Sequence, residues 1–151
     1  MKLALYKGTR PGVAGLYNRL GRALSHGPYS HVEVVFKDRR SASASFADGG
    51  FRIKPIGYSS KDCWDFLTLP DALEPEARKR ARDAWGIGYD VWGNIHFALG
   101  MVKDSRDKLF CSEGAALMLQ WRDAWRYCPN SLATRAMDQY GSVFCDSPWA
   151  D

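Results

Sequence analysis

The chain has 151 residues, of which 46% are hydrophobic and 25% are charged, and 20 are aromatic (7 Phe, 6 Trp and 7 Tyr). This composition is typical of a globular chain with one sizeable core, and it excludes a disordered, collagen-like or low-complexity protein. We therefore expect residues 1–151 to form a single domain. The net charge of +4 neither requires nor excludes an anionic partner.

Membrane insertion and secretion are not expected from the sequence. No stretch approaches the ~20 apolar residues of a membrane-spanning helix. The apolar run at the amino terminus ends at Lys7-Gly8, which is too short for a signal-peptide core of about 7–15 apolar residues. We therefore expect a cytoplasmic protein with no integral membrane segment.

The cysteines do not form a recognisable disulfide or zinc pattern. They stand at Cys63, Cys111, Cys128 and Cys145, with no Cys-x-x-Cys pair among them. We therefore expect free thiols and no metal or organic cofactor. Whether Cys128 and Cys145 pair is left open by the sequence.

The first half of the chain predicts mostly strands. Alternating apolar residues and turn signals indicate strands at about 2–6, 30–37, 41–46, 51–56 and 63–69. A helix is expected over about 12–24, with an apolar stripe formed by Val13, Leu16, Leu20 and Leu24. The hairpin signal Asp48-Gly49-Gly50 joins two of the strands.

The second half predicts helices. They are expected from about Pro75 to Gly86, from Asp90 to Leu99, from Cys111 to about Trp121 and over about 131–140. In the first of these helices, the core stripe is expected to consist of Ala77, Ala81, Ala84 and Trp85. The predicted fold class is α+β, an antiparallel sheet in the first half with helices packed on it.

Cys111 is the first residue whose chemistry stands out. The segment Leu109-Phe110-Cys111-Ser112-Glu113 reads as a loop that turns into a helix, which places the thiol at the helix N-terminus. The positive end of the helix dipole favours a thiolate there, and the free N–H groups of the first turn suit an oxyanion. The alternative is an inert, buried structural cysteine.

A cysteine nucleophile needs a base, usually an imidazole. The chain offers His26, His31 and His96. His96 stands in an apolar helical segment and His26 in a loop, whereas His31 projects from a regular strand that would hold a base rigidly. We therefore expect His31 to be the base.

A third group should orient the imidazole, and the sequence offers more than one. Glu33 lies two positions along the same strand and so on the same face as His31. Ser43 or Ser45 on the next strand are alternatives at cross-strand positions. Glu33 is also compatible with a simple ion pair to Lys37 or Arg39.

These residues resemble motifs of the circularly permuted papain-like hydrolases, relatives of the NlpC-type cell-wall peptidases. Three pieces match in order: Ser30-His31-Val32-Glu33-Val34-Val35, Gly88-Tyr89-Asp90 and Phe110-Cys111-Ser112-Glu113. In this family the histidine strand precedes the cysteine helix, and a Tyr-Asp pair precedes an aromatic-Cys-Ser-Glu motif by roughly twenty residues. The resemblance covers about positions 28–120 and implies a permuted papain-like fold. The segment Asp48-Gly49-Gly50-Phe51-Arg52-Ile53-Lys54 is similar to a branch found in tailed phages and prophages, which implies a phage-encoded protein.

The resemblance implies roles for single residues. Cys111 would be the nucleophile and His31 the general base. Many relatives carry the third member as a Glu on the strand after the histidine strand, but this chain has Ser43-Ala44-Ser45-Phe46 there. Three alternatives follow: Glu33 replaces it, a serine serves as a weaker acceptor, or the activity is lost.

The function expected from residues and resemblance together is a cysteine amidase or peptidase. Its substrate would be a small molecule, peptide or lipid with an amide or ester bond, cleaved through a thioester. One alternative is a lipid acyltransferase or esterase related to lecithin retinol acyltransferase, which needs a membrane-facing apolar surface that the sequence does not reveal. Another is a catalytically inactive binding or virion-associated module.

A nucleic-acid partner is not expected. The basic runs Lys37-Asp38-Arg39-Arg40 and Arg78-Lys79-Arg80-Ala81-Arg82 have no interleaved aromatic residues and match no nucleic-acid-binding motif. The sequence does not specify the oligomeric state.

Overall fold

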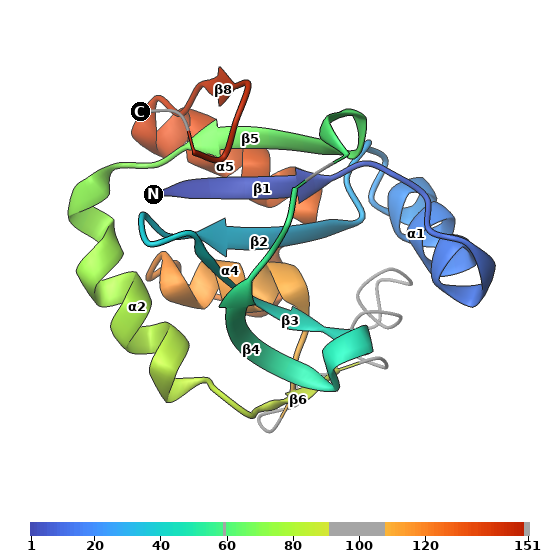
Figure 1. Cartoon of the computed structure of the whole chain (residues 1–151), viewed down its shortest axis with the longest axis horizontal. Coiled ribbons are helices and arrows are strands. Elements are labelled where there is room, and N and C mark those ends of the chain that lie inside the picture. Colours follow the sequence, from blue (N-terminus) through green and yellow to red (C-terminus); the bar gives the residue numbers. More distant parts are fainter. Residues whose placement is uncertain (59, 91–107, 150–151) are drawn as a thin grey trace.

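The computed structural model describes residues 1–58, 60–90 and 108–149, and a curled eight-stranded sheet forms its centre (Figure 1). The order across the sheet is β7-β6-β4-β3-β2-β1-β5-β8. All neighbours are antiparallel except β6 and β7, which are parallel. The strands are β1 (Lys2–Tyr6), β2 (His31–Val35), β3 (Arg40–Ser45), β4 (Gly50–Pro55), β5 (Trp64–Thr68), β6 (Gly88–Tyr89), β7 (Lys108–Leu109) and β8 (Phe144–Cys145).

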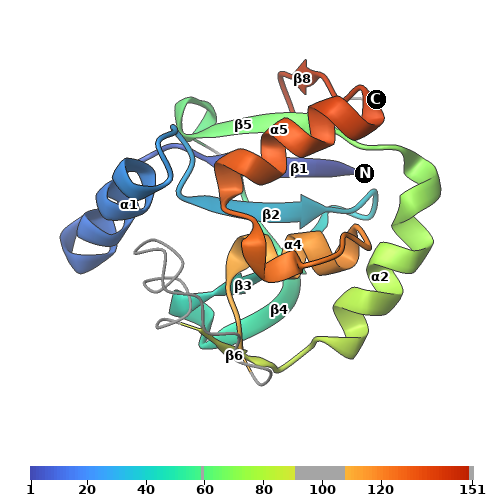
Figure 2. The same ribbon diagram turned by 180° about the vertical axis from the view of Figure 1, so that it is seen from behind.

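Four α-helices surround the sheet within the described part of the chain. They are α1 (Gly12–Leu24), α2 (Glu74–Asp83), α4 (Cys111–Met118) and α5 (Pro129–Tyr140). Helices α4 and α5 cover one face of the sheet, α2 passes along its side, and α1 projects beyond the ends of β1 and β2 (Figure 2). The short 3₁₀ turns are η1 (Phe46–Asp48), η2 (Lys61–Cys63), η3 (Asp71–Leu73) and η4 (Ala124–Arg126). The predicted α+β class, with helices packed on a sheet, is confirmed.

Strand β2 is buried on both faces, so a charged side chain on this strand is shielded from water. Val32 and Val34 are fully buried in the main core beneath the helices. On the other face, Val35 packs in a smaller cluster with Ala4, Tyr58 and Phe66. Glu33 points to this second face and is only 2% exposed. The regular alternation of the strand therefore places a carboxylate in an apolar layer.

The longer elements agree with the sequence predictions, but some details do not. The two-residue strands β6, β7 and β8 carry too little periodicity to be predicted, and the helix expected at 90–99 lies outside the described residues. The prediction that Trp85 joins the core was wrong, since the side chain is 59% exposed. The reason is that α2 ends at Asp83 and the chain turns through Gly86, whose φ is +85°, so Trp85 leaves the helical stripe while Ala77 and Ala81 remain buried.

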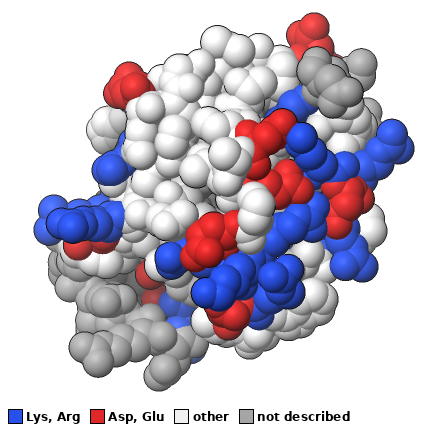
Figure 3. All heavy atoms as spheres, turned by 90° about the vertical axis from the view of Figure 1, so that its left-hand side faces the viewer, with Lys and Arg blue, Asp and Glu red and all other residues white. Residues whose placement is uncertain are grey.

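The basic run on α2 belongs to a surface of mixed charge. Arg78 contacts Asp38 at 2.8 Å and Glu74 at 2.7 Å, and Arg80 contacts Glu76 at 2.9 Å. Figure 3, which looks at the side of the molecule where α2 lies, shows basic and acidic side chains next to one another. Because acidic side chains pair with these arginines, the basic run on α2 does not form a patch of positive charge.

No helix among the described residues is both long and apolar enough to cross a lipid bilayer.

Candidate active site

Cys111 is the first residue of α4, as the sequence predicts. Phe110 precedes it in an extended conformation, and the Phe110 N–H donates to Glu113 Oε2 at 3.4 Å, so Glu113 caps the helix. The Cys111 residue is 2% exposed. The backbone N–H groups of Val32 on β2 and Ser112 in the first turn of α4 lower the pKa of the Cys111 thiol. Both groups thus favour a negative charge on the sulfur.

A glycine sets the distance between this helix and the sheet. Gly114 lies against the ring of Phe51 on β4, and a Cβ added at Gly114 would come within 2.8 Å of the Phe51 ring. A larger residue would therefore push α4 away from the strands on which it packs. This close approach positions Cys111 beside the first residue of β2.

His31 lies between Cys111 and Glu33. Its ring interacts with the Cys111 sulfur, which raises the pKa of His31, and its Nε2 lies 3.2 Å from Glu33 Oε1. Because Glu33 occupies Nε2, Nδ1 is the ring nitrogen left to exchange a proton with the sulfur. The Trp64 ring stands edge-on to the imidazole, with 6.4 Å between centroids. The three predicted site residues therefore form one chain of contacts.

The charges of these groups favour a thiolate and an imidazolium. Burial lowers the pKa of His31, but the Cys111 sulfur and the Glu33 carboxylate outweigh it and raise that pKa to about 9. Burial raises the pKa of the Cys111 thiol, but His31 and the two backbone amides overcome this effect, so the pKa lies below its ordinary value. Each of the two groups therefore favours the charged form of the other.

Glu33 remains ionised although it is buried. Burial raises the pKa of Glu33, but His31 and, to a smaller extent, Arg52 outweigh this effect and lower the pKa to about 2. Arg52 binds the carboxylate with two hydrogen bonds, from Nη2 to Oε1 at 2.8 Å and from Nη1 to Oε2 at 3.2 Å. The Tyr58 hydroxyl donates to Oε2 at 3.4 Å. A bidentate guanidinium and a phenol thus fix the group that orients His31.

Arg52 and Tyr58 are functional neighbours that the sequence did not reveal. Arg52 faces Ser43 across the β3–β4 pairing, which brings it to the Glu33 face of the sheet, and Asp48 Oδ2 accepts from its Nε at 2.9 Å. The available signal was the spacing of Arg52 and Lys54, which places both on one face of β4. Tyr58 follows the strand in a segment with no periodicity, so nothing in the sequence indicated it.

The two serine alternatives do not orient the imidazole. The Ser43 hydroxyl donates to the Val32 carbonyl at 2.7 Å and so serves the backbone of β2. Ser45 lines a cavity beside His31, but no hydrogen bond joins the two side chains within the described part of the chain. Glu33 is therefore the residue that holds His31, and it does not form the alternative ion pair with Lys37 or Arg39.

His26 and the other three cysteines are not part of this cluster of contacts. His26 is exposed in a loop, with φ at +51°, and His96 lies outside the described residues. Cys63, Cys128 and Cys145 are free thiols of intermediate exposure. The pairing of Cys128 with Cys145, which the sequence left open, does not occur.

An apolar cavity opens beside His31. Its volume is about 260 Å³, and its walls come from α1, from the start of β2, from η1 and from Tyr89. Val13, Ala14, Tyr17 and Phe46 supply much of its apolar lining. A substrate group next to His31 would therefore meet mostly hydrocarbon surface.

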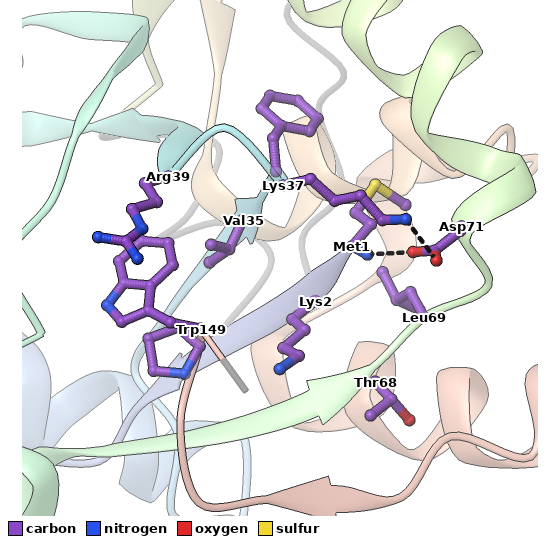
Figure 4. Close-up of a pocket in the computed structure, with 11 residues that line it drawn as sticks. Met1, Lys2, Val35, Lys37, Arg39, Thr68, Leu69, Asp71 and Trp149 are labelled. Carbon is purple, nitrogen blue, oxygen red and sulfur yellow. Dashed lines mark hydrogen bonds and ion pairs between the residues drawn. The ribbon is translucent and has the colours of Figure 1, made fainter. Parts of the chain in front are cut away.

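A second cavity lies at the other end of β2 and has a different character. Its volume is about 480 Å³, and it is lined by cationic residues, Trp149 and the first residues of β1 (Figure 4). Lys37 and the Met1 amine both contact Asp71 at 2.7 Å, and the Arg39 guanidinium lies 5.7 Å from the Trp149 ring centroid. This cavity has no cysteine, serine or histidine among its lining residues.

Among the residues that the structure describes, no group of three or more His, Cys, Asp or Glu side chains is placed to hold a metal ion. Comparison with known proteins adds no assignment, since no protein-family model and no curated protein matches the chain.

Proposed function

We propose that the protein is a cysteine hydrolase of the amidase or peptidase type, which cleaves an amide or ester bond through a thioester. The observation that carries the proposal is the contact chain Cys111–His31–Glu33 at a helix N-terminus. An inert buried thiol has no need of a charged imidazole, and a buried carboxylate beside that imidazole is costly without a function or a strong partner. The three groups match the roles of nucleophile, base and orienting residue.

The proposed reaction uses these groups in order. The Cys111 sulfur attacks the carbonyl carbon, and an S–C bond forms while the carbonyl oxygen becomes an oxyanion beside the backbone N–H groups of the first turn of α4. The bond to the leaving amine or alcohol then breaks, and His31 gives that group its proton. Water next attacks the thioester, His31 accepts a proton, and cleavage of the S–C bond releases the acid and restores the thiolate.

We also propose that the fold is the circularly permuted papain-like, NlpC-type arrangement. Support comes from the chain order, with the histidine on β2 before the cysteine at the start of α4. Glu33, on the histidine's own strand, takes the place of the family's carboxylate on the following strand. A phage-encoded origin and a cytoplasmic location remain predictions from the sequence.

A lipid ester is the second candidate substrate, and the cavity beside His31 favours it. Val13, Ala14 and Phe46 give this space an apolar wall suited to an acyl chain. The alternative of a catalytically inactive module was favoured by the absence of a carboxylate on β3. Glu33 on β2 contacts His31 instead, so that absence no longer favours an inactive module.

Acylation with p-nitrophenyl acetate tests the proposal. The wild-type protein should release a burst of p-nitrophenol equal to its active sites and carry an acetyl group on Cys111, identified by peptide mass spectrometry. Cys111→Ala should abolish the burst, His31→Ala should slow it by about 10²-fold or more, and the control Cys63→Ala should leave it unchanged. A burst of wild-type size in Cys111→Ala, or no acylation of Cys111, would overturn the proposal.

A further inference from the structure

The apolar side of helix α1 faces away from the protein core. Its apolar stripe points to solvent, with Val13 84%, Leu16 61%, Leu20 50% and Leu24 40% exposed. The residues that α1 buries are Gly15 and Asn18. An amphipathic helix of a globular protein normally turns its apolar stripe to the core, so this orientation is the reverse of the usual one.

Polar contacts on the inner side fix this orientation. Asn18 Nδ2 donates to Ser30 Oγ at 3.1 Å, and the Arg10 N–H donates to Asn18 Oδ1 at 3.3 Å. Arg22 donates from Nη1 to the Gly8 carbonyl at 2.5 Å and from Nη2 to Thr9 Oγ1 at 2.7 Å. Rotation that buried the leucines would break all of these bonds. The outward stripe is therefore held in place by the fold.

The inner side also leaves no room for a different packing. A Cβ added at Gly15 would lie 1.9 Å from the Arg10 carbonyl oxygen, so the helix touches the preceding loop through bare backbone. Together with the polar hydrogen bonds, this contact holds α1 in the orientation that exposes its apolar stripe.

The charge around α1 is positive. Residues 8–24, which comprise α1 and the loop before it, contain no Asp or Glu and three basic residues: Arg10, Arg19 and Arg22. Arg10 and Arg19 are exposed, and neither forms an ion pair within the described part of the chain. The Arg10 guanidinium lies 5.3 Å from the Tyr6 ring centroid. An apolar stripe flanked by arginines that form no ion pair is typical of a helix that lies in the interface of an anionic membrane.

The exposed apolar surface continues beyond the helix. Phe46 on η1 is 70% exposed and lines the same cavity as Val13, Ala14 and His31. In Figures 1 and 2, α1 and the η1 turn lie on the same side of the molecule. The apolar surface thus reaches from α1 to the cavity beside the candidate site.

We propose that the outward face of α1, formed by Val13, Leu16, Leu20 and Leu24 and flanked by Arg10 and Arg19, docks on an anionic lipid surface. The leucines enter the boundary between headgroups and acyl chains, and the two arginines meet the lipid phosphates. This is the apolar surface that the sequence did not reveal. The inference does not depend on Cys111 being catalytic.

Vesicle co-sedimentation of the Cys111→Ala protein tests docking without turnover. Vesicles that contain phosphatidylglycerol should bind the protein, vesicles of phosphatidylcholine alone should bind it less, and added salt should weaken the difference. Leu16→Ser with Leu20→Ser should lower binding by about tenfold or more for each leucine. Arg19→Glu should lower binding to the anionic vesicles only.

A matched control distinguishes binding through this face from nonspecific hydrophobic binding to vesicles. Val143→Ser with Phe144→Ser removes two side chains of similar exposure, 62% and 54%, near β8, and should leave binding unchanged. Failure to bind anionic vesicles, or equal loss in the control, would overturn the proposal. Sedimentation velocity tests whether the face instead binds a second copy of the chain. If the wild-type protein is a dimer, and Leu16→Ser with Leu20→Ser dissociates it, the face belongs to a dimer interface and lipid docking is overturned. A vesicle-binding protein that is not acetylated by p-nitrophenyl acetate would leave docking supported and the proposed hydrolase wrong.

Discussion

His31 Nε2 lies 3.2 Å from Oε1 of Glu33, the residue two positions further along the same strand. Side chains at this spacing share one face of a strand, so β2 alone holds both the base and the group that orients it. The arrangement needs no carboxylate from β3. It also keeps the pair rigid, because β1 pairs with β2 along its whole length, and β3 pairs with its last two residues, Val34 and Val35.

Activity should depend on pH through two limbs. The rate constant kcat/KM should rise as Cys111 loses its proton, at a pH below the ordinary thiol pKa, because the neighbouring imidazolium stabilises the thiolate. It should fall as pH passes about 9, where His31 loses the proton that the leaving group needs. Hydrolysis of an amide such as p-nitroacetanilide, whose amine leaving group must take up a proton, checks this profile from acid to alkaline pH. A single rising limb at the ordinary thiol pKa would contradict it.

Glu33→Gln should move the alkaline limb to lower pH. The substitution keeps an acceptor oxygen for His31 but removes the negative charge that helps to raise its pKa, while the Cys111 contribution remains. We expect kcat/KM at neutral pH to fall by up to about 100-fold. The control Glu76→Gln changes a carboxylate on the surface of α2 and should keep the wild-type profile. An unchanged alkaline limb in Glu33→Gln would show that Glu33 does not act on His31.

Alkylation provides a measurement that needs no substrate. Limiting iodoacetamide at pH 6 should modify Cys111 before Cys63, Cys128 and Cys145, because the neighbouring imidazolium stabilises the thiolate of Cys111. His31→Ala should slow the modification of Cys111 and leave the other three unchanged. Peptide mass spectrometry gives the extent at each site. Equal modification of all four thiols in both proteins would argue against an activated pair.

The candidate pair was predictable because each member carries a local signal, and because both stand in the order of the family motifs that the chain resembles. Cys111 stands at a loop-to-helix boundary and His31 in a strand with clear alternation, and both features are short-range. Arg52 was not assigned, because its role requires the register of β3 with β4, which brings it opposite Ser43. The outward stripe of α1 was missed for a similar reason. Periodicity locates Leu16 and Leu20 on one side of a helix, but long-range polar contacts decide which side faces the protein.

Arg52→Met should destabilise the fold strongly. The substitution leaves the buried Glu33 carboxylate without its bidentate partner, which costs about 3–5 kcal/mol of unfolding free energy for a buried pair. Arg52→Lys keeps a positive charge without the two parallel bonds and should lie between wild type and Arg52→Met. The control Arg126→Met removes an exposed pair with Asp123, whose atoms are 3.9 Å apart, and should cost at most about 1 kcal/mol. Urea denaturation ranks the variants, and equal stability of Arg52→Met and wild type would contradict the assignment.

Gly114→Ala should separate the helix from the sheet and so uncouple the candidate pair. The added methyl would come within 2.8 Å of the Phe51 ring, and relief of that overlap should cost about 1–3 kcal/mol. The shift of α4 should also lengthen the contact between Cys111 and His31, so alkylation of Cys111 at pH 6 should slow. Gly57→Ala is the matched control, because a Cβ there meets no atom within 4 Å. A Gly114→Ala protein with reduced stability but unchanged Cys111 reactivity would show that the approach of α4 to Phe51 supports the core without setting the geometry of the pair.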